Sequence, residues 1–498
     1  MTIKKAVTEG GIVCGAESLD QRITTYKGIP YAAPPVGENR WKAPRPVQKW
    51  EGEKICDTYS KIPVQPKRKD GFWKREFYPL DLAHSEDCLY LNIWTPAQST
   101  EDKLPVFVWI YGGGFEYGYS NSMYIDGHAF AKQGIVFVSV NYRVGLLGFF
   151  TDPLLDAENE DGNSGNWGIW DQIAAIKWVR RNIAAFGGDA DNITIGGQSA
   201  GATSVQILTT TALTQDDIAG AIMQSGGGFY PFFDFPYRTK KDMQAKASLK
   251  EILGVETLEQ ARELSVEEIL EGQRRLLEKD TLAYFPIVDG TILKEDINVA
   301  VKEGRVHNIP YIIGNTSEEQ MFHIGTPKEK FIESARKNYG ADAEEYLAAA
   351  STENQEAYAA MLFGLMSENL QQGVYDFAEF RAQQGGKDVF VYEFSRRLPG
   401  EDNIGAIHSA DYFYTFQCLP YSRRDMRGVD FELARAMNKF WANFIKTANP
   451  NGDDLPHWPA YEQYNPMYMD LGEWQGKRPI RYNRRQFIRS KILQKLKK

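Results

Sequence analysis

Short apolar runs alternate with helical patterns along the middle of this chain. The runs are rich in β-branched and aromatic residues, and most are apolar on both faces, as expected of strands that helices cover on both sides. They lie at residues 89–94, 106–111, 135–142, 193–197, 221–226, 311–315 and 389–394. The clearest helix between them is 168–186, where apolar residues recur at spacings of three and four. The alternation predicts an α/β fold with a mostly parallel central sheet and helices on both faces.

Residues 239–279 interrupt this alternation with a polar stretch of helical pattern. Two tetrapeptides within it, TLEQ at 257–260 and SVEE at 265–268, have the form of capping boxes, which begin helices. We expect inserted helices over about residues 230–285 that roof an active site; a plain surface excursion is the alternative interpretation. Because the chain has neither a fixed-period repeat nor a low-complexity linker, we interpret residues 1–498 as a single domain.

Composition and charge narrow the classes of function. The 498 residues are 43% hydrophobic and 25% charged, which is ordinary for a protein with a large buried core. The net charge of −9 argues against a general nucleic-acid binder. We interpret the basic stretch 481–498 as a solvated helix end; a nucleic-acid or membrane role is the alternative interpretation. No stretch has the roughly 18 uninterrupted apolar residues that cross a bilayer, so we expect no membrane span. Four cysteines, and no apolar run behind the N-terminal lysines, favour a cytoplasmic location. The pattern does not indicate an oligomeric state.

The stretch TIGGQSAGATS at 194–204 surrounds one serine, Ser199, with very small residues. It contains the pattern G-x-S-x-G, from Gly197 to Gly201, between a buried strand and a run of small residues suited to a helix start. In a nucleophile elbow, such a strand-to-helix turn exposes the serine Oγ and the backbone N–H of the next residue, here Ala200. Glycine at both flanking positions lets the backbone bend tightly. The sequence therefore favours Ser199 as a nucleophile over an ordinary Gly/Ser turn.

A serine nucleophile needs a base, an acid that orients the base, and donors for the oxyanion. We expect the donors on the loop Gly112-Gly113-Gly114, which follows a strand; a phosphate-binding loop is discounted because no G-K-[ST] follows. His408, one of six histidines, follows the last strong strand by a loop and is the candidate base. Glu318 and Glu319 follow an intermediate strand, and we expect at most one of them to be the acid. The order serine, glutamate, histidine is that of the α/β-hydrolases.

These motifs resemble those of the type-B carboxylesterases, the family that includes cholinesterases and bacterial p-nitrobenzyl esterases. The resemblance covers nearly the whole chain, and it implies the α/β-hydrolase fold. It rests on YKGIPYAAPPVGENRW (26–41), SEDCLYLNIWTP (85–96), WIYGGGF (109–115), NYRVGLLGFF (141–150), GNWGIWDQIAAIKWVRRNIAAFGGDADNITIGGQSAG (165–201), AIMQSGG (221–227), FPIVDG (285–290), GAIHSADYFYTF (405–416) and FWANFIKTANPNG (440–452).

The resemblance also implies roles for single residues. It makes Ser199 the nucleophile, His408 the base and Glu319 the acid, and it implies no metal or cofactor. Two further sets follow from matching positions: the oxyanion-hole residues Gly113, Gly114 and Ala200, and the structural ion pairs Arg40 with Glu86 and Arg143 with Asp171.

Four positions depart from the family pattern. Gln198 stands where glutamate is usual, which removes a negative charge beside the site and argues against cholinesterase-like recognition of cationic substrates. Gln320 replaces a usual glycine, and Asp411 a frequent glutamate. Cys88 matches a cysteine that is disulfide-bonded in secreted members, but the expected partner position near Val64 has no cysteine, so we predict a reduced core thiol.

The function that the resemblance implies is a serine carboxylesterase that hydrolyses small-molecule esters through an acyl-serine intermediate. Two alternatives stay open: a non-catalytic, cholinesterase-like binding or adhesion module, and an amidase, lactonase or acyltransferase built on the same residues. The aromatic stretches 226–235 and 411–416 either line an acyl pocket or pack the core. We expect short- to medium-chain acyl esters as substrates.

Overall fold

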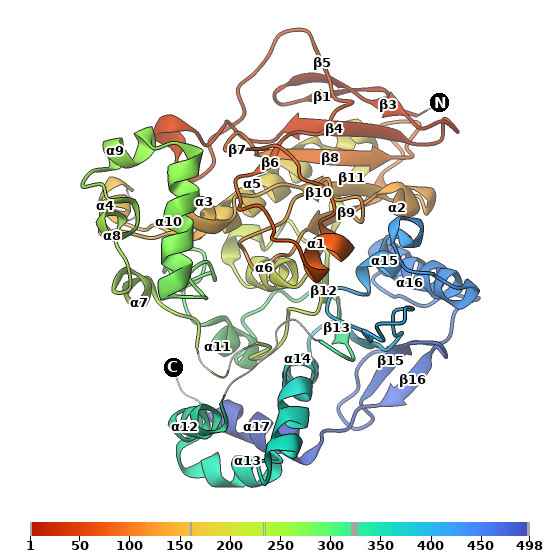
Figure 1. The fold of residues 1–498 in the computed structure, drawn as a ribbon. Coiled ribbons are helices and arrows are strands. Elements are labelled where there is room, and N and C mark those ends of the chain that lie inside the picture. The colour runs from red at the N-terminus through yellow and green to blue at the C-terminus, as the bar shows by residue number, and fades with distance from the viewer. Residues whose placement is uncertain (1, 160–161, 233, 235, 320–326, 496–498) are drawn as a thin grey trace.

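A large mixed sheet forms the centre of the molecule in the computed structural model, which describes residues 2–159, 162–232, 234, 236–319 and 327–495 (Figure 1). Within these residues the sheet has eleven strands in the order β16-β15-β14-β13-β12-β11-β9-β10-β8-β4-β3. Their bounds are β3 (Ala16–Glu17), β4 (Thr24–Pro30), β8 (Tyr90–Thr95), β9 (Leu104–Ile110), β10 (Val136–Val140), β11 (Gly188–Gln198), β12 (Gly220–Gln224), β13 (Tyr311–Thr316), β14 (Val389–Phe394), β15 (Met467–Leu471) and β16 (Gly476–Pro479). The α/β prediction is confirmed, and each of the seven predicted strands is present.

Parallel pairing runs without a break from β10 to β15 in that order. The outer pairs, β10 with β8, β8 with β4, β4 with β3 and β15 with β16, are antiparallel. Because the carboxyl ends of parallel strands meet at one edge, the loops after β9, β11, β13 and β14 are brought together there. These four loops carry the candidate residues.

Helices connect the strands and pack against the sheet, as the α6 contacts with β11 and β12 illustrate. The predicted helix 168–186 is α5 followed by a 3₁₀ turn at Ile183–Phe186. The helices are α1 (Phe72–Phe77), α2 (His128–Lys132), α3 (Gly145–Phe149), α4 (Pro153–Glu158), α5 (Trp167–Asn182), α6 (Ala200–Leu208), α7 (Lys240–Gln244), α8 (Leu249–Leu253), α9 (Leu258–Glu263), α10 (Val266–Lys279), α11 (Ile297–Lys302), α12 (Lys328–Tyr339), α13 (Ala343–Ala349), α14 (Gln355–Gln383), α15 (Tyr412–Thr415), α16 (Gly428–Thr447) and α17 (Arg484–Lys495). In the described chain, none is long and apolar enough to cross a membrane. Two smaller sheets join β1 (Lys5–Thr8), β2 (Gly11–Cys14) and β5 (Glu53–Ile55), and β6 (Ile62–Pro63) and β7 (His84–Ser85).

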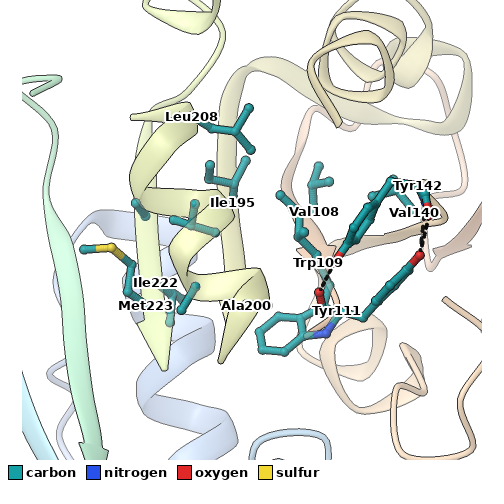
Figure 2. Close-up of a cluster of buried hydrophobic side chains, with 14 of the residues drawn as sticks. Val108, Trp109, Tyr111, Val140, Tyr142, Ile195, Ala200, Leu208, Ile222 and Met223 are labelled. Atoms are coloured by element: carbon teal, nitrogen blue, oxygen red, sulfur yellow. Dashed lines mark hydrogen bonds between the residues drawn. The ribbon is translucent and has the colours of Figure 1, made fainter. Parts of the chain in front are cut away.

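Buried side chains from β9, β11, β12 and α6 form the core beneath the carboxyl edge (Figure 2). Ile195, Leu208 and Ile222 are completely buried there. Beside them the rings of Tyr111 and Tyr142 stack with centroids 4.2 Å apart. Each hydroxyl donates to the other residue's backbone carbonyl, at 2.7 and 2.8 Å, so each buried phenol group has a hydrogen-bond partner. This double link fixes the end of β9, from which the glycine loop 112–114 departs.

Helices α7 to α10 follow β12 and precede β13 in the chain, where the sequence predicts an insertion, and they lie at one side of the molecule (Figure 1). Both predicted capping boxes are present, with Thr257 capping α9 and Ser265 capping α10. Arg40 attaches this segment to the rest of the molecule, because its guanidinium donates to the carbonyls of Ala261 (2.8 Å) and Leu264 (3.0 Å). The same guanidinium makes a bidentate pair with Glu86 at 2.6 and 2.7 Å, as the resemblance implies.

The other ion pair and the cysteines also match the expectations. Arg143 donates to both carboxylate oxygens of Asp171, at 2.7 and 2.8 Å, and both side chains are buried. All four cysteines lie among the described residues and are free thiols, and Cys88 is buried in the core.

The basic C-terminal stretch is a packed helix, so its interpretation as a solvated helix end is wrong. Helix α17 contacts α13 and α14, and Arg489 is 1% exposed. Arg489 Nε donates to Asp234 at 2.7 Å, and Nη2 donates to the carbonyl of Tyr230 at 2.9 Å. Buried arginines require such partners, and here the partners belong to the segment that follows β12.

Candidate active site

Ser199 occupies a strained turn between β11 and α6. Its φ of 57° and ψ of −127° lie in a region that non-glycine residues rarely adopt. Its backbone N–H donates to the carbonyl of Gln224 at 2.8 Å, which ties the turn to the neighbouring strand β12. Ser199 is 8% exposed and lines a cavity, and no hydrogen bond from its Oγ to a described side chain is present. The turn thus presents the hydroxyl to the cavity, as a nucleophile elbow does.

Close backbone contacts explain why the neighbours of Ser199 are so small. A Cβ added to Gly201 would lie 2.1 Å from the carbonyl oxygen of Ile110. A Cβ added to Gly112 would lie 2.3 Å from the carbonyl oxygen of Gln198 and 3.0 Å from Cβ of Ser199. The distances of 2.1 and 2.3 Å to backbone oxygens are too short for any side chain. The glycine loop and the serine turn therefore touch through their backbones.

The glycine loop and α6 supply unpaired amide groups beside the serine. Gly113 and Gly114 have φ values of 123° and 67°, which glycine adopts most readily. With Ala200, the first residue of α6, they line the same cavity as Ser199. Among the described residues, none of the three N–H groups donates a hydrogen bond. Such free donors at a helix start and a glycine loop suit an oxyanion.

His408 and Glu319 form a buried pair at this edge. His408 Nδ1 is hydrogen-bonded to Glu319 Oε2, and the two residues are 2% and 0% exposed. The other carboxylate oxygen accepts from the backbone N–H of Thr316 at 2.8 Å, and the backbone N–H of Glu319 donates to Ser367 Oγ at 2.7 Å. The carboxylate is thus held on both oxygens and fixes the imidazole. Because Nδ1 faces a carboxylate, it carries the proton, and Nε2 is left as an acceptor.

Gln198 occupies the acceptor face of that imidazole. Its Nε2 lies 3.2 Å from His408 Nε2 and donates to it, while no hydrogen bond joins Ser199 Oγ to His408, two residues that the structure describes. The expected contact between base and hydroxyl is therefore replaced by a contact with the preceding side chain. The physical reason is competition: an amide N–H satisfies the single Nε2 lone pair as well as a hydroxyl does.

The adjacent Glu318 points away from His408, so of the two candidate acids only Glu319 contacts the imidazole. Its carboxylate accepts from the backbone N–H of Ala406 at 2.7 Å and pairs with Arg397. It thereby fixes the loop that leads to His408 without touching the imidazole. Gln320 and His323 lie outside the described residues.

Asp411 belongs to a buried network behind the histidine that the sequence did not predict. Its Oδ2 accepts from Gln224 Nε2 at 2.8 Å and from the Tyr392 hydroxyl at 3.0 Å. Burial raises the pKa of Asp411 to about 6, and the charge of Glu319 acts in the same direction. Gln224 is the one polar residue of β12 and ends that strand, and a polar residue at the end of an apolar run is the signal in the sequence that points to this network.

The cavity at this edge has a volume of about 750 Å³, and its walls are rich in aromatic residues. Helix α10 contributes Leu277 and the residues after it contribute Leu282 and Phe285, so the inserted segment does form part of the roof. Of the aromatic stretches named above, Phe232 and Tyr412 line the cavity, whereas Phe229, Phe413 and Phe416 are core residues. The remaining wall includes Arg68, Trp73, Phe77, Tyr78, Glu116, Tyr117, Tyr119, Tyr124 and Tyr284.

Comparison with known proteins decides the family. The model of the carboxylesterase family matches residues 4–488. The chain belongs to the carboxylesterase family. Fumonisin B1 esterase of Sphingopyxis macrogoltabida is 31% identical over 474 residues, covering 92% of this chain and 84% of the relative. Carboxylesterase 1F of Mus musculus is 31% identical over 509 residues, covering 92% and 87%.

Solved structures of this family share the fold. A thermophilic PNB esterase superposes with a TM-score of 0.84 at 27% identity, covering 98% of this chain and 100% of that one. A carboxylesterase of Geobacillus stearothermophilus gives 0.80 at 30% identity, covering 97% and 99%. The chain therefore has the carboxylesterase fold over almost all of its length, and it is a carboxylic ester hydrolase.

Proposed function

We propose that this carboxylesterase hydrolyses esters of small molecules through an acyl intermediate on Ser199, with His408 as base and Glu319 as the residue that orients it. The contact that supports this most is the one between His408 Nδ1 and Glu319 Oε2. It leaves Nε2 as the acceptor for a proton, and both His408 and Ser199 line one cavity. The free N–H groups of Gly113, Gly114 and Ala200 are proposed to bind the oxyanion.

The reaction follows from these roles. Ser199 Oγ bonds to the ester carbonyl carbon while its proton passes to His408 Nε2, after the Gln198 amide has left that position. The carbonyl oxygen becomes an oxyanion, and each N–H donor lowers the barrier by roughly 3 kcal/mol. The alcohol then leaves with the proton from Nε2. Water attacks the acyl-serine by the same steps, with His408 again taking the proton and returning it to Ser199.

An organophosphate tests the nucleophile directly. We expect one phosphyl adduct, found by peptide mass spectrometry on the peptide that contains Ser199, together with complete loss of hydrolysis of 4-nitrophenyl acetate. Ser199→Ala should carry no adduct and have no activity, whereas Ser204→Ala, one turn along α6, should keep both. Full inhibition with Ser199 unmodified would refute the assignment.

The open alternatives make different predictions in the same assay. A non-catalytic binding module would release no 4-nitrophenolate. An amidase, lactonase or acyltransferase would prefer an anilide, a lactone or an added alcohol acceptor over the simple ester with the same acyl group. We propose the ester because the family and its relatives are esterases. We also propose a cytoplasmic location, which the four free thiols support and which cell fractionation tests.

A further inference from the structure

Arg68 places a positive charge in the wall of the candidate active-site cavity. Its guanidinium carbon lies 4.3 Å from the ring centre of Tyr78 and 3.9 Å from that of Tyr117. Both tyrosines line the same cavity. Contacts between a guanidinium and aromatic faces hold the group in place without using its hydrogen-bond donors.

The guanidinium of Arg68 has no carboxylate partner. Among the described residues no acidic oxygen lies within 4.0 Å of it, and its buried Nε has no acceptor. Arg40 and Arg143 behave differently, since each forms a bidentate pair with an acid. A guanidinium offers a fork of donors that matches a carboxylate, so the fork of Arg68 is available to a bound molecule.

The other charges around the cavity only partly oppose Arg68. Glu116 is the carboxylate among the described residues that line the cavity, and burial raises its pKa. Gln198, beside the nucleophile, is neutral where the family usually has glutamate. Lys67 and Lys69 flank Arg68 in the chain, are exposed, and have no ion-pair partner within the described residues. Exposed basic residues next to Arg68 in the chain attract anions by long-range steering.

We propose that the substrates of this enzyme are esters that carry a free carboxylate, such as half-esters of dicarboxylic acids, and that Arg68 binds that carboxylate while the ester carbonyl lies at Ser199. This inference rests on the proposed function, because it assigns a substrate class to the same cavity. The tyrosine faces orient the guanidinium, and the low polarity of the aromatic wall strengthens an ion pair formed there.

The test compares the monoethyl and diethyl esters of the dicarboxylic acids from succinic to suberic acid. The two esters of one acid differ in charge but share the reacting group, and the length series accommodates the reach from Ser199 to Arg68. The readout is the ratio of kcat/KM for the monoester to kcat/KM for the diester, from initial rates of ethanol release. For the dicarboxylic acid whose length gives the wild-type enzyme its highest ratio, we expect Arg68→Met to lower the ratio about tenfold or more, because one charge-assisted contact is lost.

Three further variants sharpen the comparison. Glu116→Gln should raise the ratio, because it removes the opposing carboxylate. Arg68→Lys should keep only part of it, because the charge remains but the fork of donors is lost. Lys27→Met removes another cation that lies over a tyrosine, 4.5 Å from the ring centre of Tyr59 and outside the cavity, and should leave the ratio unchanged. Added salt should lower the ratio in the wild-type enzyme.

The outcomes separate the two proposals. If Arg68→Met lowers the rates for both esters by the same factor, or if the wild-type enzyme turns over diesters but no monoester, the carboxylate inference is wrong while esterase activity stands. If neither ester is hydrolysed, or if Ser199→Ala retains activity on the diesters, the proposed function itself fails. A merely structural role of Arg68 in stacking would not change the charge ratio.

Discussion

The side-chain amide of Gln198 donates a hydrogen bond to His408 Nε2 over 3.2 Å. It thereby occupies the nitrogen to which the hydroxyl of Ser199 would donate in the proposed reaction. In the proposed reaction, this neutral group must therefore move before His408 Nε2 can accept a proton. A glutamate at this position would instead face the same nitrogen with a negative charge and favour its protonated form. The substitution Gln198→Glu therefore tests how a negative charge beside His408 Nε2 affects the reaction.

Gln198→Glu should move the acid limb of the kcat/KM profile to higher pH by about one unit. Since the base works only when neutral, a carboxylate that stabilises the imidazolium makes activity begin at higher pH. The measurement is a pH–rate profile with 4-nitrophenyl acetate. Gln198→Leu, which has similar size and no charge, should leave the acid limb where it is. An equal shift in both variants would contradict the electrostatic explanation.

The two adjacent glutamates offer a matched test of the orienting acid. Glu319→Gln should lower kcat/KM by roughly 10³ to 10⁴, because the amide does not hold the correct imidazole tautomer or stabilise its cation. Glu318→Gln removes the ion pair with Arg397, and Glu318 makes no contact with His408. Its kcat/KM should therefore fall by no more than about tenfold. Steady-state kinetics on both variants, with circular dichroism to verify folding, gives the answer. Similar losses in the two variants would mean that Glu319 has no special role.

Gly112→Ala should reduce activity by about 10² or more, because the added Cβ would lie 2.3 Å from the carbonyl oxygen of Gln198. The glycine loop must then move away from the serine turn, and the oxyanion donors move with it. Gly428→Ala is the control, since a Cβ there meets nothing within 4 Å. Unchanged kcat in Gly112→Ala would show that the loop can shift without cost.

Asp411 should make the protein less stable as pH rises from about 4 to 6. Its pKa is raised from 3.8 to about 6 in the folded state, so between these values the folded chain holds a proton that the unfolded chain has released. The stabilisation is complete below the unfolded pKa and is lost as pH rises through the folded one. In Asp411→Asn this loss is absent.

Thermal unfolding of the two proteins at several pH values between these limits measures the effect. The Tm of Asp411→Asn relative to wild type should therefore increase with pH across this window, by an amount that corresponds to about 3 kcal/mol or less. Parallel curves of Tm against pH for the two proteins would show that folding does not raise the pKa of Asp411.

Burial on both faces explains which parts of the fold could be predicted. The central strands β10 and β12 are buried at every position, so they appear in the sequence as continuous apolar runs. The edge strands β15 and β16 are partly exposed and mix polar with apolar residues, and the runs did not reveal them. Helix α14 does not stand out in the sequence either, because its buried residues gather toward its second half instead of forming one regular stripe.

Some residues of the candidate site can be predicted from the sequence, and others cannot. Chain order and strand ends indicate Ser199 and His408, since backbone topology alone brings those loops to one edge. The choice between Glu318 and Glu319 needed the resemblance, because adjacent side chains differ only in direction. The Gln198 contact with His408 and the network at Asp411 depend on side-chain conformations set by distant elements, which local patterns do not encode.

The last helix has a consequence for how the protein is made. Arg489 of α17 holds Asp234, and Phe232, two residues before Asp234, lines the cavity. A nascent chain that still lacks residues 484–495 has no such anchor, although its serine, glutamate and histidine have long been synthesised. In the proposed reaction, catalytic competence should therefore follow the emergence of residues 484–495 from the ribosome, because these residues hold the wall of the cavity.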